Sequence, residues 1–166
     1  MRGNFRLLAG VMAAASIGLW STAVLAGTWK YGEDPRGNSE LQYLENGKAL
    51  FYIGCGRAFG LHVHYPGKAK KDGAAAITIT AGKASMNFKG EFEEPDAEMA
   101  TEFLQWDLGF RRQDPELYGK RWKAMLSRLL DMLGSGQSLT ISAGKDSYQL
   151  PPNDAKNWRE PFDGCG

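Results

Sequence analysis

The two histidines of this 166-residue chain, His62 and His64, stand two positions apart in the stretch LHVHY. On a strand, residues at this spacing share one face of the sheet. Two neutral imidazoles on one strand face are half of a typical metal site. The local sequence lacks the other half, so a further ligand must come from another strand, and Asp107 and Glu91 are the candidates. The alternative is a polar, partly exposed strand face whose histidines only respond to pH.

Acidic residues crowd the region from 91 to 102 without an intervening base. They lack the one-three-five spacing and the glycine of a calcium-binding loop. Two carboxylates alone can hydrolyse glycosides, but a chain with 19 Asp and Glu residues offers many such pairs. We therefore interpret the region as a solvated acidic loop. Its acidic residues are Glu91, Glu93, Glu94, Asp96, Glu98 and Glu102.

Basic residues gather between positions 111 and 128, along a predicted helix and its approach. Together with the acidic loop they make a dipolar surface, which suits docking of a charged protein or an anionic envelope polymer. The alternative is an ordinary polar helix face. The candidate partner-binding residues are Arg111, Arg112, Lys120, Arg121 and Lys123.

The sequence contains no recognisable catalytic motif. Gly-x-Ser-x-Gly, a phosphate-binding glycine-rich loop and His-Glu-x-x-His are all missing from it. A nucleophile would have to use His62 or His64 as its base, and no serine is placed by the sequence to meet them. We therefore expect a protein without enzymatic activity.

Residues 1–26 have the three parts of a secretory signal peptide. Arg2 and Arg6 come first, an apolar run follows, and Val24-Leu25-Ala26 provides small residues before a cleavage site. The apolar run is short for a membrane span and is interrupted by polar and glycine residues, so we expect cleavage after Ala26 rather than a retained anchor. This predicts a periplasmic or secreted protein with one domain, residues 27–166, and no stable membrane span after cleavage.

Cys55 and Cys165 are the only cysteines. In an exported chain an even pair is interpreted first as a disulfide, and free thiols are the alternative. The spacing differs from the Cys-x-x-Cys of redox enzymes and zinc sites.

The charge balance argues against nucleic acid as a partner. Without Arg2 and Arg6, 18 of the 20 Lys and Arg residues remain against 19 Asp and Glu residues. A nucleic-acid-binding surface needs a clear basic excess.

Alternating apolar and polar residues between glycine or proline turns predict an antiparallel sheet. Asn46-Gly47 is a strong hairpin signal because both residues tolerate positive φ. One helix is predicted over 115–133, with Asp114 as its cap and Pro115 at the first position. A short helix is expected in the tail that carries Trp158 and Phe162. The predicted strands are 29–31, 40–44, 49–54, 59–65, 76–80, 85–92, 102–110, 138–142 and 147–150.

These features predict an α+β fold: a curved antiparallel sheet or small β-sandwich, with one long amphipathic helix packed on it and a short C-terminal helix. The function expected from them is that of a small exported, non-enzymatic binding or accessory protein, acting on another protein or on a component of the bacterial envelope. No cofactor is expected. The alternative is a metal-binding protein or a metal-dependent enzyme that holds a divalent ion with His62 and His64.

Overall fold

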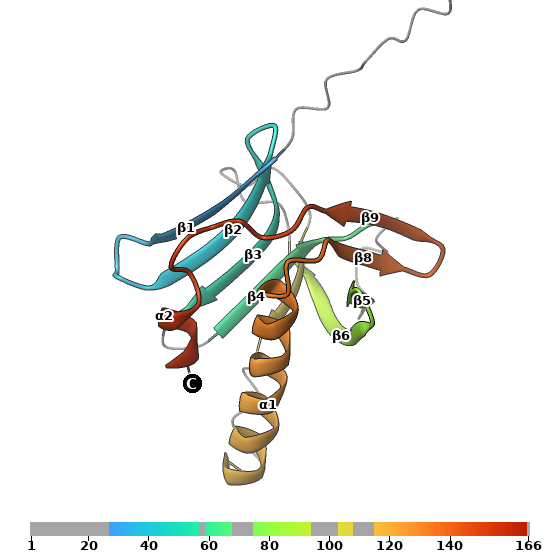
Figure 1. Ribbon diagram of the computed structural model, residues 1–166. Coiled ribbons are helices and arrows are strands. Elements are labelled where there is room, and N and C mark those ends of the chain that lie inside the picture. Colours follow the sequence, from blue (N-terminus) through green and yellow to red (C-terminus); the bar gives the residue numbers. More distant parts are fainter. Residues whose placement is uncertain (1–26, 57–58, 68–74, 94–102, 108–114, 166) are drawn as a thin grey trace, which may run out of the picture.

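The computed structural model describes residues 27–56, 59–67, 75–93, 103–107 and 115–165 (Figure 1). These ranges contain nine strands and two helices, and every strand pair is antiparallel. In chain order they are β1 (Thr28–Glu33), β2 (Ser39–Glu45), β3 (Lys48–Cys55), β4 (Phe59–His64), β5 (Ala75–Ala81), β6 (Ala84–Glu93), β7 (Phe103–Asp107), α1 (Pro115–Leu133), β8 (Leu139–Ala143), β9 (Asp146–Leu150) and α2 (Glu160–Asp163).

The strands lie in the order β1-β2-β3-β4-β7-β6-β5-β8-β9. β6 joins two parts of this sheet, because residues 84–90 pair with β5 and residues 91–93 pair with β7. Figure 1 shows the two parts at an angle, with β1 to β4 on one side and β5, β8 and β9 on the other. The prediction of a sheet-rich, antiparallel fold that also contains a helix is confirmed.

The β2–β3 hairpin turns at Asn46 and Gly47, as the sequence predicts. Both residues have positive φ, 52° and 76°, and Glu45 pairs with Lys48 across the turn. Two consecutive residues with positive φ make the tight turn that matches the twist of two neighbouring strands.

One hydrophobic core joins the strands to both helices. β4 alternates between buried and half-buried residues along its length, so one face of the strand is in the core and the other is partly open. α1 has the bounds that the sequence predicts. It buries Trp122, Leu126, Leu129, Leu130, Met132 and Leu133 in this core.

Long-range hydrogen bonds connect the two parts of the sheet. The Trp29 indole on β1 donates to the carbonyl of Pro151, just after β9, at 3.0 Å. The Tyr148 hydroxyl on β9 lies 2.8 Å from the carbonyl oxygen of His64 and 3.2 Å from that of Leu50. β9 therefore contacts the adjacent ends of β3 and β4.

Among the described residues, no helix is both long and apolar enough to span a bilayer.

Replacing Tyr148 by phenylalanine is expected to lower the free energy of unfolding by about 1–2 kcal/mol, because the part-buried carbonyls of His64 and Leu50 lose the hydroxyl hydrogen that they share. Burial raises the pKa of Tyr148 above its usual value of 10.0. The contribution of the Tyr148 hydroxyl to the free energy of unfolding is therefore complete below pH 10, and it is lost as the pH rises above 10. Urea unfolding followed by tryptophan fluorescence measures both effects.

Tyr31→Phe is the matched control, because the Tyr31 hydroxyl has no hydrogen-bond partner in the described part of the chain. Equal unfolding midpoints for the Tyr148→Phe variant and the wild type at pH 7 would show that the hydroxyl contributes nothing.

Candidate functional site

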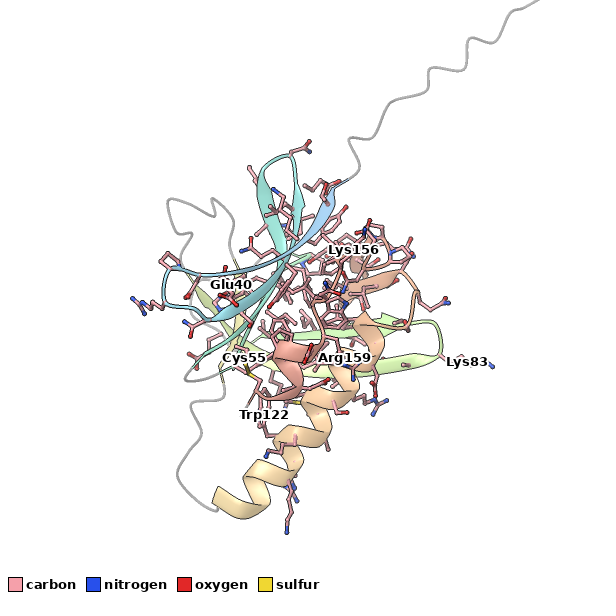
Figure 2. The ribbon with its side chains drawn as sticks, turned by 60° about the vertical axis from the view of Figure 1, so that its left-hand side comes forward. Glu40, Cys55, Lys83, Trp122, Lys156 and Arg159 are labelled. Atoms are coloured by element: carbon pink, nitrogen blue, oxygen red, sulfur yellow. A yellow bond between two sulfur atoms is a disulfide. The ribbon has the colours of Figure 1, made fainter. Side chains whose placement is uncertain are left out.

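An open hollow of about 610 Å³ lies where the turn between β1 and β2 meets the ends of β3 and β4. This volume falls within the range of about 300–1,000 Å³ that is usual for small-ligand sites. Figure 2 places Glu40 and Cys55 at this side of the molecule, with Lys83 at the opposite end. Cys55 and Gly56 form the end of the hollow nearest the disulfide.

Two glycines make the floor of the hollow. Gly54 on β3 pairs directly with Gly60 on β4. A Cβ atom at Gly54 would lie 2.5 Å from the Tyr52 hydroxyl oxygen, and one at Gly60 would lie 3.2 Å from Nε2 of His62. Each ring therefore occupies space over the glycine two positions away on its own strand. The absence of side chains at the two glycines makes this arrangement possible.

The rings of Tyr52 and His62 form a corner above this floor. Their centroids lie 5.2 Å apart and their planes are almost perpendicular, at 85°. The Tyr52 hydroxyl donates to Oε1 of Glu40 at 2.7 Å, and Oε2 of Glu40 accepts from Gln42 at 3.2 Å. Burial, and then the hydrogen bond to Glu40, raise the pKa of Tyr52. The phenol is therefore held neutral and fixed in direction.

The turn between β1 and β2 forms the polar wall. Oδ1 of Asp34 accepts from the backbone N–H groups of Arg36 and Asn38, both at 2.8 Å, and Oδ2 accepts from the Asn38 amide at 2.8 Å. Gly37 has a positive φ of 76° within this turn. The backbone N–H of Asn38 is the main cause of the lowered pKa of Asp34. The Arg36 side chain is exposed and makes no ion pair within the described ranges.

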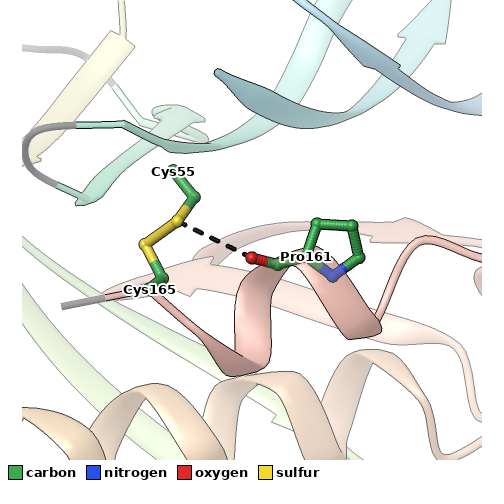
Figure 3. The surroundings of a disulfide bond; sticks show 3 residues. All are labelled: Cys55, Pro161 and Cys165. Carbon is green, nitrogen blue, oxygen red and sulfur yellow. Dashed lines mark hydrogen bonds between the residues drawn. A yellow bond between two sulfur atoms is a disulfide. The ribbon is translucent and has the colours of Figure 1, made fainter. Parts of the chain in front are cut away.

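The predicted disulfide between Cys55 and Cys165 is present (Figure 3). The two Cα atoms lie 5.8 Å apart across a sequence separation of 110 residues. Sγ of Cys55 contacts the carbonyl oxygen of Pro161 at 3.9 Å. The bond thus fastens α2 beside the end of β3. Arg159 adds a surface link, since it donates to Asp131 on α1 at 2.8 Å and to Asp163 on α2 at 3.2 Å.

The two histidines have different surroundings in the structure. His62 lines the hollow, whereas the His64 ring lies 6.0 Å from that of Tyr148 on β9. Both are half-buried on the same strand. In the described part of the chain, no three His, Cys, Asp or Glu residues are placed to hold a metal ion.

The two residues considered as further metal ligands occupy different register positions. Asp107 pairs with Gly60, and the row through His62 continues to Gln105 and then to Glu91. The metal site stays a prediction.

Three of the five candidate partner-binding residues lie in the described part of the chain. Lys120, Arg121 and Lys123 are exposed on α1, while Arg111 and Arg112 lie outside the described residues. Lys123 also lines a smaller hollow of about 320 Å³ between α1 and α2. Of the acidic region, Glu91 is exposed on β6, and 94–102 lie outside the described residues.

The hollow was not predicted from the sequence. The available signal was an aromatic ring two positions from a glycine on each strand, Tyr52 with Gly54 and His62 with Gly60. It becomes informative only when the two glycines are known to face each other.

No family model matches the chain, and no curated protein or solved structure is significantly similar to it. The kind of site must therefore be inferred from the geometry of the hollow alone. A preformed hollow with an aromatic corner and a few oriented polar groups is the usual form of a binding site for a small ligand or for part of a larger one.

Proposed function

We propose that this chain is a small exported binding protein without enzymatic activity, which acts on another protein or on a component of the bacterial envelope. The observation that carries this proposal is the hollow above Gly54 and Gly60, walled by two perpendicular rings and a polar turn. In this proposal the long amphipathic helix α1, packed across the curved sheet, and the short helix α2 are the scaffold that holds the hollow in shape.

The hydrogen bonding of the hollow supports binding rather than catalysis. A general base needs a pKa near the working pH, whereas the hydrogen bonds to Asp34 lower the pKa of its carboxyl. Glu40 accepts hydrogen bonds at both oxygens, from Tyr52 and Gln42. These carboxylates orient their neighbours, and a site whose polar groups are already fixed loses less conformational entropy when a ligand binds.

The disulfide supports an exported location, periplasmic or secreted, because such bonds persist in oxidising compartments. The exposed basic residues Lys120, Arg121 and Lys123 supply a second contact surface for an acidic partner or an anionic envelope polymer. The alternative function, metal binding by His62 and His64, draws no support from their separate surroundings.

Gly60→Val tests the proposal by filling the floor of the hollow. The added side chain crowds the His62 ring, which lies over Gly60, and valine is favourable in a strand. We expect a folded protein that captures at least tenfold less of its specific envelope component. The measurement is quantitative capture from the envelope fraction of the source organism by immobilised residues 27–166, with wild type and variant compared side by side.

Gln149→Val is the control, since it places the same side chain at an exposed position on the edge strand β9. Circular dichroism and thermal unfolding verify that both variants fold. If wild type and Gly60→Val retain the same components in the same amounts, the hollow is not the binding site and the proposal is wrong.

A further inference from the structure

We infer that the hollow binds a pyranose ring of a glycan. This inference rests on the proposed function, because it names the ligand class of the same site. A pyranose ring presents C–H groups on its faces and hydroxyl groups along its edge. A matching site therefore needs an apolar face beside groups that can both donate and accept hydrogen bonds.

The apolar face is the corner made by Tyr52 and His62. Aromatic ring faces carry partial negative charge, which attracts the weakly positive hydrogens of C–H groups. Because the two rings stand at 85° to each other, a ligand in the corner meets two differently oriented aromatic surfaces. The glycines at positions 54 and 60 let the two rings lie flat against the strands, and the open hollow of about 610 Å³ beside them leaves room for such a ligand.

The polar edge is the turn that holds Arg36 and Asn38. The Arg36 guanidinium is a donor only, while the Asn38 amide has both a donor and an acceptor. The hydrogen bond from Nδ2 of Asn38 to Asp34 fixes this amide, and its oxygen lies beside Gly56, which also lines the hollow. Sugar hydroxyls donate and accept, so this mixture of groups matches them.

Other ligand classes fit less well. An extended peptide commonly adds to an open sheet edge, but β3 and β4 are internal strands with partners on both sides. The described lining contains no aliphatic side chain to receive a hydrocarbon chain. Asp34 balances the charge of Arg36, so the hollow lacks the excess of cations that a phosphate-rich ligand would require.

The test uses residues 27–166, with the disulfide formed, on an array of neutral and uronic-acid oligosaccharides, followed by titration calorimetry with each oligosaccharide that binds. We expect at least one oligosaccharide to bind the wild type. Tyr52→Leu and Gly60→Val should each weaken its affinity at least tenfold. Tyr31→Leu is the matched control, because it removes a half-buried tyrosine from β1 outside the hollow.

Arg36→Gln identifies the kind of sugar. If Arg36→Gln weakens the affinity at least tenfold while Lys83→Gln leaves it unchanged, the sugar is a uronic acid paired with the guanidinium. A change below twofold assigns a neutral ring. Lys83 is a suitable control because it is exposed and lies at the far end of the molecule from Cys55 (Figure 2).

Three outcomes would overturn the inference. Oligosaccharide binding that survives both Tyr52→Leu and Gly60→Val would place the sugar elsewhere. An empty array, together with hollow-dependent capture of a protease-sensitive envelope component, would refute the glycan and leave the proposed function standing. An empty array with no hollow-dependent capture at all would refute both.

Discussion

Replacing Cys55 and Cys165 together by alanine is expected to lower the free energy of unfolding by about 4 kcal/mol. The bond closes a loop across 110 residues, and the chain-entropy account gives about 4.7 kcal/mol for a loop of roughly 100 residues. Domains of this size are stable by only about 5–15 kcal/mol. The double variant should therefore unfold at a much lower denaturant concentration, measured by guanidinium unfolding at pH 7.

Reduction provides the control for this prediction. Dithiothreitol should destabilise the wild type by a similar amount and leave the double variant unchanged, because the variant has no thiol or disulfide to reduce. A difference below about 1 kcal/mol between wild type and variant would contradict the prediction. It would mean that the link restricts the unfolded chain far less than its loop length implies.

The parts of the fold that were predictable depend on neighbouring residues. Alternation along LHVHY predicts a strand, and β4 buries every second residue. Asn46-Gly47 predicts a hairpin because its backbone preference is local. Pro115 fixes the start of α1, and the apolar spacing that follows predicts its length. Only the compartment argument links distant positions, by pairing Cys55 with Cys165.

The parts that were not predictable depend on pairings between segments far apart in the chain. Nothing local indicates that β7 lies between β4 and β6, or that β6 changes partner after residue 90. The same limit applies to the histidines. Their spacing predicts a shared strand face, but their surroundings differ because β9 brings Tyr148 to the end of β4.

The hollow also depends on a pairing between distant segments, because the turn at 34–38 lines it together with residues of β3 and β4. The turn at 34–38 is predictable from its turn-forming residue types. The hollow also depends on the register that sets Gly54 against Gly60, and on the ring positions of Tyr52 and His62. Gly54 and Gly60 are close in the sequence, but they form a side-chain-free floor only because the register of β3 and β4 sets them directly opposite each other.

Trp122→Ala is expected to lower the free energy of unfolding by about 3–5 kcal/mol, the range for truncating a large buried aromatic side chain. Trp122 is only 7% exposed, and its ring centroid lies 4.9 Å from that of Phe59 on β4. Phe59 is in turn the register partner of Cys55. The tryptophan therefore fixes α1 to the strands that end at the hollow, and its loss should also weaken ligand capture.

Arg121→Ala is the control for this variant, since the neighbouring residue on α1 is exposed and surface substitutions change stability by about 0.5 kcal/mol or less. Guanidinium unfolding followed by far-ultraviolet circular dichroism measures both variants without relying on tryptophan emission. Trp122→Phe should recover part of the lost stability because it keeps an aromatic ring against Phe59. If Trp122→Ala costs no more than Arg121→Ala, the helix does not depend on this contact, and the hollow must be held by the disulfide and the strands alone.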